Sequence, residues 1–119
     1  MADGGFLRQH SDDPQLASHI MHDYTKADLD PETRGMLDFA MKLTREPANM
    51  SEADVKVLRA LGLTDEQILS VVLITCTFNL MTRLADGLGV QVPEGRQEAH
   101  ERWLTGPALQ QKWLMTAKP

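Results

Sequence analysis

The sequence predicts an all-α protein, and three observations favour this class. Helix-capping residues begin four segments, at Asp12, Asp30, Ser51 and Thr64. Apolar residues follow these caps at the three- and four-residue spacing of a buried helix face. No stretch alternates apolar and polar residues between turn glycines, so we predict no sheet.

The composition is that of one folded domain with an acidic surface. The chain has 119 residues, of which 42% are hydrophobic and 24% charged, so wholesale disorder is excluded. Its 12 basic and 17 acidic residues give a net charge of −5. Phosphate backbones and anionic lipids attract basic surfaces, so we expect no nucleic-acid partner and no membrane partner.

The first two helices are predicted from acidic caps followed by proline. Residues 12–14 begin a short helix that runs to about His22. Residues 30–32 begin a second helix, which ends before Pro47 because a proline ring disfavours helix at the preceding residue. The apolar stripe of this second helix consists of Met36, Phe39, Ala40 and Leu43.

The third helix begins at Ser51, and its acidic first turn favours the helix dipole. Gly62 suits the left-handed conformation that ends a helix. The buried side of this helix is expected to consist of Val55, Leu58 and Leu61.

The longest helix follows Thr64, which forms a capping box with Gln67, and covers residues 65 to about 88. Residues 69–74 are apolar on nearly every helical face. A helix that is apolar all round must lie at the centre of a core or of an oligomer.

The two ends of the chain and its most apolar run bear on localisation. Residues 1–5 lack the features of a secretory signal, and the apolar run at 68–81 is shorter than the roughly 20 residues that a membrane-spanning helix needs. We therefore expect a soluble, cytoplasmic protein.

A more polar tail follows Pro93, and its Trp103 and Trp113 indicate short helices that dock onto another surface.

Cys76 is the only cysteine, which excludes an intramolecular disulfide, a Cys-x-x-Cys pair and a cysteine zinc site. It lies between Thr75 and Thr77, with no adjacent His, Lys or Arg to favour the thiolate. We expect a structural thiol that is buried in the core.

The one histidine cluster consists of His10, His19 and His22, with Asp23 beside them. His19 and His22 share a helical face and could both reach a metal ion. No cysteine or glutamate completes a ligand set, so solvated surface histidines are the preferred interpretation and a metal site is the alternative. We assign no catalytic, cofactor-binding or metal-binding residue to this chain, and no cofactor.

Asn79, Arg83 and Asp86 are spaced four and three residues apart, so they share one face of the apolar helix. Arg83 could pair with Asp86, and Asn79 could hydrogen-bond the same group. Such groups need partners when they are buried. Two interpretations stay open: a buried cluster or subunit interface that fixes helix register, and a polar cluster that faces a ligand.

Four stretches of the sequence resemble a known family: residues 37–44 (LDFAMKLT), 51–55 (SEADV), 61–68 (LGLTDEQI) and 78–90 (FNLMTRLADGLGV). They are similar to the peroxidase-related branch of the carboxymuconolactone decarboxylase and alkylhydroperoxidase D-like superfamily. The resemblance implies an all-helical fold that assembles as a homo-oligomer. It divides the chain into a partial domain of this kind at residues 1–92, lacking its N-terminal helices, and a tail at 93–119.

For active family members the resemblance implies a thiol-dependent peroxidase with a Cys-x-x-Cys pair, a His three residues later and a Glu upstream. One thiolate attacks the peroxide and the other cysteine resolves the sulfenic acid. Residues 4–8 look like the stretch after that His, which would place Asp3 near the His position and the cysteines before Met1. Cys76 lies in a different helix and is no substitute. Thr82 stands where the family often has a second Asn.

Three hypotheses follow. The chain is a degenerate relative without the redox site and is inactive by itself, or it is a late-starting version of a complete enzyme. A peroxide substrate is expected only for such a longer form. In the third hypothesis the chain is a non-catalytic oligomerisation or binding module that uses residues 65–88 and the tryptophan tail.

Overall fold

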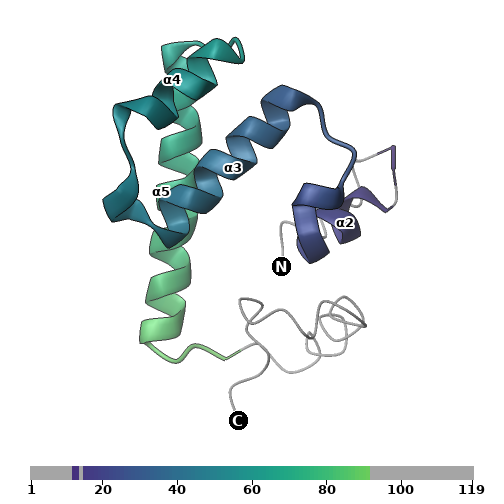
Figure 1. Ribbon diagram of the computed structural model, residues 1–119. Coiled ribbons are helices and arrows are strands. Elements are labelled where there is room, and N and C mark those ends of the chain that lie inside the picture. The colour runs from purple at the N-terminus through teal and green to yellow at the C-terminus, as the bar shows by residue number, and fades with distance from the viewer. Residues whose placement is uncertain (1–11, 14, 92–119) are drawn as a thin grey trace. The chain divides into compact units, whose positions relative to one another are not determined.

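The structure is a computed structural model that describes residues 12, 13 and 15–91 (Figure 1). These residues belong to two units, Leu29–Val90 and a second unit that includes residues 12–28, and each is described by itself. Helices form all the regular structure of the described residues, which confirms the predicted class. The predicted tail at 93–119, with Trp103 and Trp113, lies outside the described residues, as does His10.

The smaller unit contains helix α2 (Leu16–Asp23) and the 3₁₀ turn η1 (Tyr24–Lys26). Asp13 precedes α2, and its Oδ1 accepts a hydrogen bond from the backbone N–H of Gln15 at 2.8 Å. At the other end, the Asp23 carboxylate accepts from the backbone N–H of Thr25 and so begins η1. The short helix predicted after residues 12–14 is therefore present, starting two residues further along.

Helix α3 (Pro31–Arg45) begins the larger unit at the predicted cap. The Oδ1 atom of Asp30 accepts a hydrogen bond from the backbone N–H of Thr33 at 2.8 Å, and Pro31 occupies the first helical position, where no N–H is needed. The helix ends before Pro47, which starts the 3₁₀ turn η2 (Pro47–Asn49). Both ends of α3 are set by residues next to them in the sequence.

Helix α4 (Glu52–Ala60) is capped by Asp54, whose carboxylate accepts from the backbone N–H of Ser51 at 2.8 Å. Gly62 follows α4 with a φ of 99°, the left-handed conformation predicted for it.

Helix α5 (Asp65–Gly87) has the predicted capping box. The Oε1 atom of Gln67 accepts from the backbone N–H of Thr64 at 2.8 Å, and the Thr64 hydroxyl oxygen accepts in return from the backbone N–H of Gln67 at 3.2 Å.

The three longer helices pack around one small core. In Figure 1, α3 runs obliquely across α5, and α4 lies beside the first turns of α5. The buried centre consists of Phe39 from α3, Leu58 from α4, Leu63 from the following turn and Ile68 from α5. Partly buried apolar residues surround it, namely Met36, Leu43, Met50, Val55, Leu61, Val71 and Val72. The predicted stripes on α3 and α4 face this core.

Helix α5 was predicted to lie at the centre of a core or of an oligomer. It does not lie at the centre of this core. Ile68 is buried, but Leu69, Leu73 and Ile74 in the apolar stretch are 56–59% exposed. The reason is that α3 and α4 cover one side of α5, and nothing in Leu29–Val90 covers the other. By length and composition alone α5 could also cross a membrane, and only 6% of its apolar window is buried; one such helix is weak evidence for a membrane protein.

Candidate functional site

The polar residues predicted on α5 form a network with α3. The Nδ2 atom of Asn79 donates to the Thr44 hydroxyl oxygen at 2.9 Å and to the Thr75 carbonyl oxygen at 3.0 Å. Its Oδ1 atom accepts from Nη1 of Arg83 at 2.9 Å. Asn79 is half-buried and Arg83 is exposed. We call Thr44, Asn79 and Arg83 the polar cluster.

Asp86 takes no part in this network. Its carboxylate is exposed, and in the described part of the chain no ion pair joins it to Arg83. The direction of helical side chains explains this, because each Cα–Cβ bond tilts toward the helix N-terminus and so carries the guanidinium back toward Asn79. Two of the three predicted residues are therefore brought together, with Thr44 as a partner from another helix.

Cys76 is exposed, in contrast to the burial expected for it. Its side of α5 is the one that α3 and α4 leave uncovered. In the part of the chain that the structure describes, its sulfur takes part in no hydrogen bond.

The side of α5 that α3 and α4 leave uncovered is apolar, and Ile74, Phe78 and Met81 are exposed there together with several leucines. Four leucines on it, Leu69, Leu73, Leu80 and Leu84, are each more than half exposed. At 3.6 residues per turn they lie within about 60° of one another around the helix axis. We call these four residues the leucine stripe. Exposed apolar surface of this extent is typical of interaction sites.

A shallow hollow between α3 and α4 is the second feature, and sequence reasoning missed it. Its volume is 160 Å³, and it is lined by Gly35, Asp38, Phe39, Lys42, Asp54, Val57 and Leu58. Within it the Lys42 ammonium donates to Oδ1 of Asp54 at 2.7 Å. This hydrogen bond is the largest of the effects that hold the Asp54 pKa below its ordinary value of 3.8. The two residues are 12 apart on different helices, so no local signal identifies the pair.

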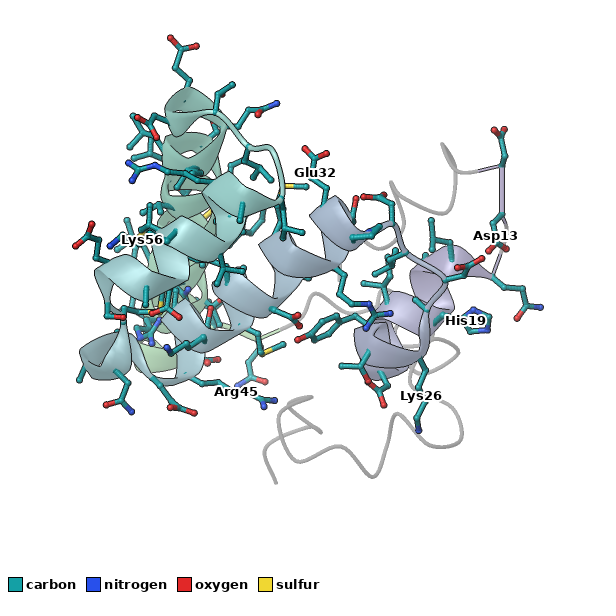
Figure 2. The ribbon with its side chains drawn as sticks, turned by 45° about the horizontal axis from the view of Figure 1, so that its top comes forward. Asp13, His19, Lys26, Glu32, Arg45 and Lys56 are labelled. Atoms are coloured by element: carbon teal, nitrogen blue, oxygen red, sulfur yellow. The ribbon has the colours of Figure 1, made fainter. Side chains whose placement is uncertain are left out.

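The histidine region offers no metal centre among the described residues. His19 projects outward from α2 and is exposed (Figure 2). Asp23 is engaged locally, with Thr25 and with Lys26 at 3.4 Å, and the Thr25 hydroxyl lowers its pKa most. The side chain of His22 lies outside the described part of the structure, and among the described side chains no three of His, Cys, Asp or Glu converge.

The chain is similar in sequence and fold to proteins of known structure. No family model and no curated protein matches the sequence. Solved structures do match it, among them an uncharacterized peroxidase-related protein from Silicibacter sp. TM1040, with 40% identity and a TM-score of 0.72. That match covers 78% of this chain and 49% of the other.

A second match is the alkylhydroperoxidase AhpD core of an uncharacterized peroxidase-related protein from Ralstonia eutropha JMP134. It has 35% identity and a TM-score of 0.70, and it covers 89% of this chain and 53% of the other. Identity at this level together with a shared helical fold confirms the resemblance seen in the sequence. The chain belongs to the alkylhydroperoxidase D-like, peroxidase-related proteins, and it spans about half the length of the structures it matches.

Proposed function

We propose that this chain is a non-catalytic helical scaffold of the alkylhydroperoxidase D-like type, which assembles through α5 and does not turn over peroxides by itself. The observation that carries the proposal is the cysteine inventory: the sequence has one cysteine, Cys76, and it is exposed on the apolar side of α5. A thiol peroxidase of the dithiol type needs a second thiol to resolve the sulfenic acid.

The surroundings of Cys76 support the same conclusion. A peroxidatic thiolate is stabilised by a nearby cation, a proton acceptor or a helix N-terminus. Cys76 lies in the middle of α5, far from its N-terminus, and its sequence neighbours Thr75 and Thr77 donate their hydroxyls to the backbone carbonyls of Val71 and Leu73. Neither threonine hydroxyl is thus directed at the sulfur.

The test is a peroxidase assay with hydrogen peroxide and dithiothreitol, run on the wild-type chain and on Cys76→Ser. We expect both proteins to consume peroxide no faster than the reductant alone. Intact mass measured after peroxide treatment follows stoichiometric oxidation of Cys76 separately from turnover. Sustained turnover by the wild type that Cys76→Ser abolishes would refute the proposal.

A thiol peroxidase made as a longer product is the second candidate, because the chain spans about half the length of the structures it matches. In that case peroxide would be the substrate of the longer form. The DNA upstream of the Met1 codon tests this candidate. In-frame codons for Cys-x-x-Cys would support it, and an in-frame stop codon directly before Met1 would rule it out.

A further inference from the structure

We draw no further inference here: the strongest candidate, the apolar side of α5 that α3 and α4 leave uncovered, already belongs to the proposed assembly through α5, and nothing in the residues that the structure describes shows what covers it.

Discussion

The side chain of Asn79 donates a hydrogen bond to the hydroxyl of Thr44, and this 2.9 Å contact joins residues that lie 35 apart in the sequence. It connects α5 to the last turn of α3. The same amide also contacts Thr75 and Arg83, so every polar atom of the Asn79 side chain has a partner. This half-buried amide therefore adds a polar contact to the apolar packing of α3 against α5.

We expect Asn79→Ala to lower the free energy of unfolding by about 1–2 kcal/mol, because it removes the interhelical hydrogen bond and leaves Thr44 without it. Urea denaturation followed by circular dichroism measures the change. Arg83→Ala is the matched control, since it removes only exposed contacts to the Oδ1 atom and the backbone carbonyl oxygen of Asn79 and should cost less than about 0.5 kcal/mol. Equal effects of the two substitutions would contradict the structural role of the Thr44 bond.

The helix boundaries of the larger unit follow from the sequence because their causes are local. Asp30 caps α3, Thr64 and Gln67 cap α5, and Gly62 ends α4, each through atoms within three residues of the boundary. A pattern of a few adjacent residues is enough to predict such an end. The apolar stripes of α3 and α4 are equally local, so their buried faces are predicted correctly.

The environment of α5 could not be predicted in the same way. Its apolar residues show which side chains avoid water, but what covers each face depends on other segments or other chains. Cys76 was expected in the core and lies exposed for this reason. The contacts of Asn79 with Thr44 and of Lys42 with Asp54 join different helices, and the local sequence pattern around each residue carries no signal for them.

The stability of the chain should fall in acid because of Asp54 and Asp30. The Lys42 ammonium hydrogen bond is the main cause that lowers the Asp54 pKa below 3.8, and the backbone N–H of Thr33 is the main cause that lowers the Asp30 pKa. A carboxyl whose pKa is lower in the folded state stabilises the fold above its unfolded pKa. That contribution is lost as the pH falls through the folded pKa.

We therefore expect the free energy of unfolding to be steady above about pH 5 and to decrease as the pH falls below about 4. Urea titrations at several pH values measure the slope. Asp54→Asn should make the slope shallower, whereas Lys56→Gln, which removes the exposed Glu52–Lys56 ion pair, should leave it unchanged. An identical acid slope in Asp54→Asn and wild type would show that Asp54 makes no such contribution.

Substitution of Gly62 should lower the stability of the fold because of its backbone conformation. Its φ is 99°, and a Cβ atom built on it meets no other atom within 4 Å. Any cost of Gly62→Ala is therefore backbone strain, about 1–2 kcal/mol, measured by thermal or urea unfolding. Gly62→Asn should cost less, since Asn tolerates the left-handed region, and the reverse order would contradict this explanation.

Substitutions of Leu58 and Leu84 by alanine distinguish a leucine that stabilises the fold from one that contributes to assembly. Leu58 is 1% exposed at the centre of the core, whereas Leu84 is 53% exposed on the leucine stripe. Leu58→Ala creates a cavity and should lower the free energy of unfolding by about 2–4 kcal/mol.

Leu84→Ala removes the same atoms from a surface position. Measured at a protein concentration low enough to keep the chain monomeric, it should change the unfolding free energy by less than about 0.5 kcal/mol. At high concentration the Leu84→Ala chain should dissociate more readily than the wild type in sedimentation, because its leucine is needed only when a second α5 covers it. A large loss of monomer stability in Leu84→Ala would mean instead that another part of the same chain covers the stripe.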